Sequence, residues 1–324
     1  MLGQKYQTYA TKGNLNNHIG VPLSILDVKN DVEIAVIEMG ANHVGEIDFL
    51  CKIAQPTHGV ITNIGRAHLE GFGGYEGVKK AKGELYQWLK AKNGTFFINT
   101  DDDTLKEMLP ADVKSIKYGC SNGDVSGERD NKDRLNLAVS ISSKDGQNTL
   151  IKTNLIGDYN IDNILAATSI GRYFKVDMEQ VRAAIENYIP DNNRSQLLEI
   201  GTNKFILDAY NANPTSMKLA LQNLEHYSVE NKVVILGDMM ELGDDSQQEH
   251  EGIINQSLAM KINKIVLVGT QFKAVADAMD TSQTLLCFDT AIETKEWMQL
   301  QEFTNTVFLI KGSRKVQLEK IISD

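Results

Sequence analysis

Cysteine is scarce in this sequence. The three cysteines among its 324 residues, Cys51, Cys120 and Cys287, are widely spaced and form no Cys-x-x-Cys pair. This pattern excludes a disulfide framework and fits a reducing compartment. The first residues also lack the basic and then apolar pattern of a secretory signal, and no apolar run approaches the length of a membrane span. We therefore expect a cytoplasmic protein without membrane insertion.

Positive charge is also in short supply. Lysine and arginine number 33 against 43 acidic residues, which gives a net charge of -10. This balance argues against a general surface for nucleic acid or anionic lipid. If the protein binds phosphate groups, it must do so with local backbone amides, a few cations or a metal ion.

The phosphate-loop pattern G-x-x-x-x-G-K-[ST] occurs nowhere in the chain. The stretch GYEGVKKAKGE (residues 74–84) contains glycine and lysine at a different spacing. Internal repeats and low-complexity segments are absent as well. A nucleotide site built from these residues would therefore lack the cradle of amides that such a loop supplies.

The residues that are present indicate a globular protein with two α/β domains. Hydrophobic residues make up 42% of the chain and charged residues 23%. Strand-like runs at 33–40, 58–65 and 95–102 alternate with helical stretches. This rhythm is typical of a mostly parallel sheet with helices on both faces. Residues 112–155 are rich in turn residues and short alternating runs, which predicts an antiparallel part. Two helices are predicted after it, at 162–174 and 178–188.

A break at 189–196, IPDNNRSQ, is the predicted linker. The α/β rhythm then restarts, with expected strands at 204–210, 232–239, 264–269 and 306–312 and expected helices at 215–227 and 246–260. We therefore predict a first domain at 1–190 and a second open α/β domain at 191–324.

Polar residues follow several of the predicted strands, where ligands bind in open α/β sheets. Glu38 is either a solvated strand-end carboxylate or an oxygen ligand for Mg²⁺. His68 lies between glycines after the next strand, and we expect it to face the same crevice. Lys82, close to Lys79 and Lys80, lies on a solvated helix face, neutralises phosphate charge, or is modified into an anionic metal ligand. The sequence alone leaves these alternatives open.

The remaining candidates have similar alternatives. Asn160 and Asn163, three residues apart in a first helical turn, provide either capping or amide contacts to a nucleobase. Arg194, in the predicted linker, is a surface residue or a phosphate clamp. Asp238 and Glu241 are most simply strand-end and helix-cap acids, and a role with an amine substrate is the weaker alternative.

Eight stretches of the sequence resemble the Mur ligases, and the resemblance runs from about residue 4 to residue 319. They are TKGNLNNHIGVP, IEMGANHVGEIDFL, TNIGRAHLEGFGGYEGVKKAKGEL, GDYNIDNILAA, NNRSQ, LDAYNANPTSM, ILGDMMELG and IKGSR. The second and the sixth are specific for the member that adds D-alanyl-D-alanine. The resemblance implies a central ATPase domain followed by a Rossmann-like α/β carboxyl-terminal domain.

The implied activity is the ATP-dependent ligation of D-Ala-D-Ala to UDP-N-acetylmuramoyl-tripeptide through an acyl phosphate, with Mg²⁺, in peptidoglycan precursor synthesis. The implied site residues fall into three groups. The metal ligands, also catalytic, are Glu38, His68 and a carbamylated Lys82; the ATP contacts are Asn160, Asn163, Arg194 and Asp208; the substrate contacts are Asn14, Asn16, Asn17, His18, Asn211, Asn213, Lys311, Ser313 and Arg314.

The chain also departs from the family pattern. The family has a UDP-binding domain, a strand and a phosphate loop before the stretch QKYQTYATKGNLNN, so we expect a segment in front of Met1 or a complementing partner segment. The alternative is a catalytically inactive fragment that binds nucleotide or dipeptide weakly. A folylpolyglutamate synthetase-like ligase is a further alternative, against which DAYNANPTSM argues. Lys315 stands where the family usually has glycine, which predicts strain if that position needs a positive φ.

Overall fold

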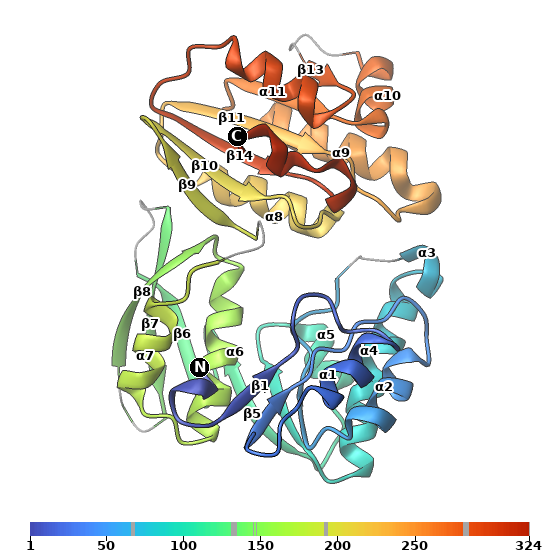
Figure 1. Cartoon of the computed structure of the whole chain (residues 1–324), viewed down its shortest axis with the longest axis vertical. Helices are drawn as coiled ribbons and strands as arrows, with labels where there is room; N and C mark the ends of the chain where they lie inside the picture. Colours follow the sequence, from blue (N-terminus) through green and yellow to red (C-terminus); the bar gives the residue numbers. More distant parts are fainter. Residues whose placement is uncertain are drawn as a thin grey trace. The chain divides into compact units, whose positions relative to one another are not determined.

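The computed structural model describes residues 1–65, 69–130, 135–144, 146, 148–190, 194–280 and 285–323. The chain divides into two compact units (Figure 1). Unit 1 comprises Met1–Asp130, Ala138–Thr153 and Asn160–Asn187, and unit 2 comprises Asn131–Leu137, Asn154–Tyr159 and Tyr188–Asp324. His68, one of the predicted metal ligands, lies outside the described residues.

The main sheet of unit 1 has six strands in the order β3-β4-β5-β6-β7-β8. The first four are parallel to one another, and β7 runs antiparallel to β6. The antiparallel part predicted for 112–155 is thus confirmed for the pair β6–β7, whereas β5, in the same range, is parallel to both of its neighbours. The bounds are β3 His58–Val60, β4 Thr95–Asn99, β5 Lys114–Gly119, β6 Val125–Arg129, β7 Asn136–Ser143 and β8 Asn148–Ile156.

Two short strands form a separate parallel sheet in unit 1. They are β1 (Thr8–Ala10) and β2 (Ile34–Val36), paired from Thr8 with Ile34 to Ala10 with Val36. The predicted strand at 33–40 is therefore shorter than expected, and Glu38 lies just after its end. Among the described strands, β2 pairs only with β1 and β3 only with β4.

The helices of unit 1 pack on its sheets through apolar faces. α2 and α4 contribute Leu50 and Leu89 to a core with Phe96 and Ile98 of β4, while α6 contacts β4, β5 and β6. The bounds are α1 Gly20–Leu26, α2 Glu46–Ala54, α3 Leu69–Phe72, α4 Tyr75–Ala91, α5 Asp103–Met108, α6 Asn160–Tyr173 and α7 Met178–Glu186, with a 3-10 turn η1 at Leu2–Gln4.

Unit 2 contains the second open sheet, in the order β13-β12-β11-β14-β10-β9. All neighbours are parallel except β9, which runs antiparallel to β10. The register of β10 and β14 pairs Asp208 with Lys311. The bounds are β9 Gln196–Ile200, β10 Asn203–Asp208, β11 Asn231–Gly237, β12 Lys264–Val268, β13 Leu285–Phe288 and β14 Thr306–Lys311.

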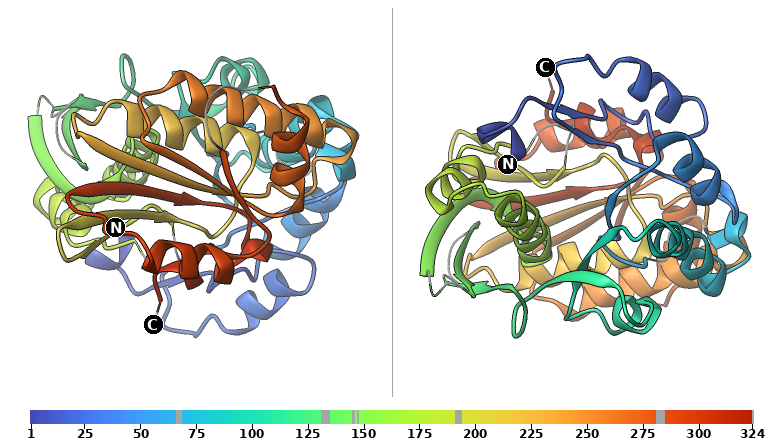
Figure 2. Two further views of the ribbon diagram at one scale, coloured as in Figure 1. Left: turned by 90° about the horizontal axis from the view of Figure 1, so that it is seen from above. Right: turned by 90° about the horizontal axis from the view of Figure 1, so that it is seen from below.

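Helices cover both faces of the second sheet (Figure 2). α8, α9 and α10 pack on one face, and α11 packs on the other together with the 3-10 turn η4. Alternation along the strands explains this, because Val234 and Leu236 point to the first face and Val233 and Ile235 to the second. The bounds are α8 Pro214–Glu225, α9 Ser246–Ala259, α10 Thr270–Ala278, α11 Ala291–Gln299, η2 Gly243–Asp245, η3 Arg314–Val316 and η4 Leu318–Ile321.

The predicted fold class, a mostly parallel α/β protein, is thus confirmed. Among the helices of the described residues, none combines the length and the apolar character that a bilayer span requires.

Candidate functional site

The loop that precedes α1 contacts the residues that follow β2. Asn16 donates a hydrogen bond from Nδ2 to Glu38 Oε1 (2.8 Å), and its carbonyl accepts one from the Gly40 amide (2.8 Å). The Glu38 amide donates to Thr11 Oγ1 (2.9 Å). The carboxylate of Glu38 is exposed, so it is held in place on one side and open to a ligand on the other.

The other predicted residues of this loop are exposed. Asn17 accepts hydrogen bonds at Oδ1 from the amides of Ile19 (3.1 Å) and Gly20 (2.9 Å), which stabilises the start of α1. Asn14 and His18 lie on the surface. The side chain of Asn17 thus has a structural partner, whereas Asn14 and His18 are presented to solvent.

Lys82 lies on α4 and is only partly exposed. Its ammonium donates to the Asn63 carbonyl (2.8 Å), which follows β3. Burial lowers the pKa of Lys82 below its ordinary value. A lysine with a lowered pKa has a larger neutral fraction than a solvated one, and the neutral amine is the form that reacts with electrophiles.

Apolar contacts bring the segments that carry Glu38 and Lys82 together. Ala41, Ile64 and Phe72 pack with Val78 and Ala81 in one cluster. Ala41 follows β2, Ile64 follows β3, Phe72 lies in α3, and Val78 and Ala81 lie in α4. This cluster thus brings the segments that follow β2 and β3 against α4, the helix that carries Lys82.

The amino-terminal turn of α6 carries the predicted adenine contacts. Asn163 donates from Nδ2 to Asn160 Oδ1 (3.0 Å); Asn160 is buried and Asn163 is exposed. The structure therefore couples the two amides directly. Only Asn163 faces solvent.

One polar group near α6 was missed by the sequence analysis. Ligand atoms of Asp101, Cys120 and Asp162 all lie within 4.8 Å of one another. Burial and the charge of Asp101 raise the pKa of Asp162. The run of three acids at 101–103, just after β4, was the available signal, but Cys120 and Asp162 come from other elements.

In unit 2 the ends of β10 and β14 form a buried ion pair. Lys311, 2% exposed, donates from Nζ to Asp208 Oδ2 (2.6 Å) and to the Asn211 carbonyl (3.4 Å). Asp208 Oδ1 accepts the amide of Ser195 (3.2 Å), and the Ser195 hydroxyl is hydrogen-bonded to the Tyr159 hydroxyl. Both carboxylate oxygens of Asp208 therefore have protein partners, which gives this residue a positioning task.

Arg194 and Arg314 share an aromatic neighbour. The Cζ atom of Arg194 lies 4.1 Å from the ring centroid of Tyr210, and that of Arg314 lies 5.8 Å from it. Both guanidinium groups are exposed. Both arginines were predicted from the sequence, whereas Tyr210 was not.

The turn after β14 is fixed by the end of β11. Ser313 donates from its amide (3.2 Å) and from its hydroxyl (2.6 Å) to the Asp238 carbonyl, and it is buried. The carboxylate of Asp238 accepts the amides of Gln271 (3.0 Å) and Phe272 (2.9 Å) in the first turn of α10. Asp238 is thus a helix-cap acid, as predicted, but its helix begins more than thirty residues later.

Two predicted residues after β10 have backbone partners. Asn213 accepts the Ser216 amide at Oδ1 (2.9 Å) and caps α8, and Asn211 accepts the Ala212 amide (2.8 Å). The condition for strain at Lys315 is not met, because this residue lies in η3 and has no positive φ. The left-handed conformation occurs instead at Gln317.

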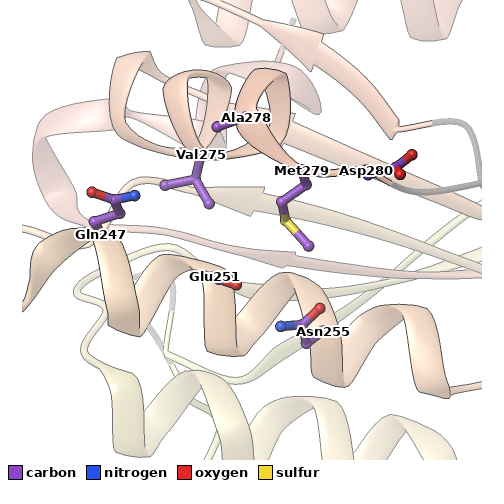
Figure 3. A pocket seen from close by; sticks show the side chains of 7 residues that line it. All are labelled: Gln247, Glu251, Asn255, Val275, Ala278, Met279 and Asp280. Carbon is purple, nitrogen blue, oxygen red and sulfur yellow. The ribbon is translucent and has the colours of Figure 1, made fainter.

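A pocket of about 330 Å³ lies between α9 and α10 (Figure 3). Gln247, Glu251 and Asn255 line it from α9, and Val275 and Ala278 line it from α10. None of the predicted site residues lines it.

The fold and these two sets of strand-end residues define a class of protein. Residues 1–171 match the model of the Mur ligase middle domain, and residues 193–314 match that of the "Mur ligase, glutamate ligase domain". The chain belongs to the Mur ligase family.

Known members narrow the comparison. The UDP-N-acetylmuramoyl-tripeptide–D-alanyl-D-alanine ligase of Bacillus subtilis is 32% identical over 335 residues, covering 100% of this chain and 71% of the relative. A crystal structure of MurF from Acinetobacter baumannii has a TM-score of 0.88 and 31% identity, covering 99% of this chain and 71% of that one. The MurF ligase of Thermotoga maritima, solved in complex with ADP, has a TM-score of 0.87 and 25% identity, covering 99% of this chain and 73% of that one.

Proposed function

We propose that this chain ligates D-alanyl-D-alanine to UDP-N-acetylmuramoyl-tripeptide with ATP, as its relatives in peptidoglycan synthesis do by name. The observation that carries the proposal is the match along the whole chain to relatives named for this reaction. The exposed carboxylate of Glu38 and the arginines of unit 2 support it, because the reaction needs groups that bind a metal and anions. We further propose that residues 1–190 are the ATP-binding domain and 191–324 the carboxyl-terminal domain.

The chemistry follows from the substrates. The terminal carboxylate of the tripeptide attacks the γ-phosphorus of ATP, and ADP leaves. The amine of D-Ala-D-Ala then attacks the acyl carbon, a peptide bond forms, and inorganic phosphate carries away the electron pair of the broken C–O bond. Both steps concentrate negative charge, so they depend on positioning and on cations.

The proposed roles of the residues follow this charge distribution. Glu38 and a carbamylated Lys82, with His68, hold Mg²⁺, which neutralises phosphate oxygens when bound. Asn163 and Asn160 contact the adenine, and Arg194 the phosphates. Asn14, Asn16 and His18 contact the nucleotide-sugar substrate; Asn211 and Arg314 contact the dipeptide. Because their own groups already have partners, Asp208, Lys311, Ser313, Asn17 and Asn213 keep these segments in shape.

A phosphate loop is the missing part of this assignment. No G-x-x-x-x-G-K-[ST] motif is present in the 324 residues, and loss of its amides weakens ATP binding. We propose that a polypeptide segment outside these residues supplies the loop. The separate sheet β1–β2 supports this proposal. Among the described strands β2 pairs only with β1, so its other edge is open to a further strand.

Phosphate release tests the proposal. The chain, alone and mixed with a segment that carries the loop, is incubated with ATP and UDP-tripeptide, with or without D-Ala-D-Ala. Release that requires the dipeptide, and that is lost in Lys82→Ala, supports the ligase. Release with folate and glutamate would point to the folylpolyglutamate synthetase-like alternative, and absence of release in every mixture would favour the inactive fragment.

A further inference from the structure

Tyr210 contacts both exposed arginines at the carboxyl end of the second sheet. Cations within about 6 Å of a ring centroid are attracted by the π-face, and guanidinium groups are the most frequent partners. The distances of 4.1 Å for Arg194 and 5.8 Å for Arg314 lie within this range. One ring therefore attracts two positive charges, one from a residue shortly before β9 and one from a residue shortly after β14.

The two guanidinium groups lack a carboxylate partner in the part of the chain that the structure describes. Lys311, a buried cation at the same strand ends, is by contrast paired with Asp208. In a chain of net charge -10, these two exposed arginines share the face of one ring. Their mutual repulsion is relieved by an oxyanion, since the guanidinium fork matches carboxylate and phosphate geometry.

The backbone that carries each arginine is already fixed. Asp208 binds the amide of Ser195, next to Arg194, and also the ammonium of Lys311. Ser313, next to Arg314, is held by the Asp238 carbonyl. What remains free is the direction of the two long side chains, and the ring of Tyr210 is the contact that restricts both.

We propose that Tyr210 is a positioning residue that holds Arg194 and Arg314 as the two arms of one oxyanion site, which takes a carboxylate or a phosphate group. The inference deepens the proposed function, on which it rests only for the identity of the natural anion: the phosphate proposed for Arg194, or the dipeptide carboxylate proposed for Arg314, is held by both arginines together. The site lies entirely within unit 2.

The test observes the arginines directly. The side-chain Nε–Hε signals of Arg194 and Arg314 are assigned by Arg→Gln variants and followed by NMR while inorganic phosphate, or separately D-Ala-D-Ala, is added to the full chain. In the unsubstituted protein both signals move with the same apparent Kd. Tyr210→Leu weakens that Kd about fivefold to tenfold, because two cation–π contacts are lost.

Matched variants separate positioning from folding. Tyr210→Phe keeps the ring and leaves the Kd within about twofold of the original. Tyr188→Leu removes an exposed tyrosine of the same unit and leaves the Kd unchanged. A response to phosphate alone identifies a phosphoryl group as the ligand, and a response to the dipeptide alone identifies a carboxylate; either supports the site.

Three results would overturn the proposal. The first is an equal change of the Kd in Tyr210→Phe and Tyr210→Leu. The second is a different Kd for each arginine in the unsubstituted protein. The third is that neither arginine signal shifts on addition of phosphate or of D-Ala-D-Ala. Because turnover is not measured, anion binding that persists while the ligation assay fails would reject the proposed function and leave this site standing.

Discussion

At the scale of single residues, Lys82 combines partial burial with a lowered pKa. If its neutral amine takes up CO₂, a bond forms between Nζ and carbon, a proton leaves, and the side chain becomes an anionic metal ligand. Arginine cannot replace it, because its guanidinium stays protonated. We expect Lys82→Ala and Lys82→Arg to lower dipeptide-dependent phosphate release by about a hundredfold or more.

Rescue makes this prediction specific. Acetate added to Lys82→Ala supplies a free carboxylate and should restore part of the rate, whereas Lys82→Arg leaves no space for it. Lys80→Ala, an exposed lysine on the same helix, serves as the control and should retain activity. Full activity of Lys82→Arg would contradict a carbamate at this position.

The buried pair Asp208–Lys311 is a second residue-scale case. Removal of one partner leaves the other charge buried without compensation, at a cost of about 3 kcal/mol or more. We expect Asp208→Asn and Lys311→Met each to lower the free energy of unfolding of unit 2 in urea. The double variant should cost less than the sum of the two single ones, and strict additivity would show that the ion pair does not couple them.

At the scale of elements, His250 connects α9 to the end of β11. The ring is fully buried; Nδ1 donates to the Ser246 carbonyl (2.7 Å) and Nε2 accepts the Met239 amide (3.0 Å), so the histidine is neutral. Burial lowers the pKa of His250, although Asp238 and Glu249 act in the opposite direction. Protonation at Nε2 would remove the acceptor that the Met239 amide needs.

The pH dependence follows from this shift. The unfolded histidine, with a pKa of about 6.5, binds a proton before the folded one does. The free energy of unfolding should therefore be undiminished above about pH 6.5 and fall as the pH drops through the unfolded value, by up to about 1.4 kcal/mol per unit. Urea unfolding between pH 7.5 and 5.5 measures this slope.

His250→Gln isolates the contribution. His58 also has a lowered pKa, caused by burial and by Lys114, and adds a slope of the same sign from unit 1. Subtracting the slope of His250→Gln from that of the unsubstituted protein cancels the contribution of His58. An identical slope in His250→Gln would refute the assignment to His250.

The elements also show how far the sequence alone leads. The continuous apolar runs of β11, β12 and β14 were predicted, because buried parallel strands have no polar face. α10, β13 and α11 were missed: they have four to nine residues, and the four apolar residues of β13 are too short a run to show a period. Length and burial, rather than local propensity, define such elements.

The candidate site divides in the same way. Glu38, Lys82 and the two arginines were predicted, since they follow strands or match family stretches. The contact of both arginines with Tyr210 was not predicted, because these arginines flank β9 and β14, and neither was the helix that Asp238 caps, because it begins more than thirty residues further along the chain. Such contacts depend on strand order, which no local pattern encodes.

At the scale of the whole molecule, unit 1 has exposed apolar side chains along α1 and on the small sheet. Ile19, Leu23 and Leu26 lie on one side of α1, and Val36 lies on β2 of the small sheet. A two-stranded sheet is marginal on its own, and an open edge with apolar neighbours favours association. We therefore expect the chain to self-associate at rising concentration, as sedimentation velocity would measure.

Charge at this place should reverse the association. Leu23→Glu combined with Leu26→Glu places two carboxylates on the exposed side of α1 and should shift the chain to the monomer without loss of stability, since both side chains are solvated. The control is Leu300→Glu, because Leu300 in unit 2 is as exposed as Leu26, at 83% and 81%. If a loop-carrying segment covers the same surface, its addition should dissociate the unsubstituted protein and fail to bind the double variant. Equal effects of the control and of the double variant would mean that exposure alone, and not this surface of α1, drives the association.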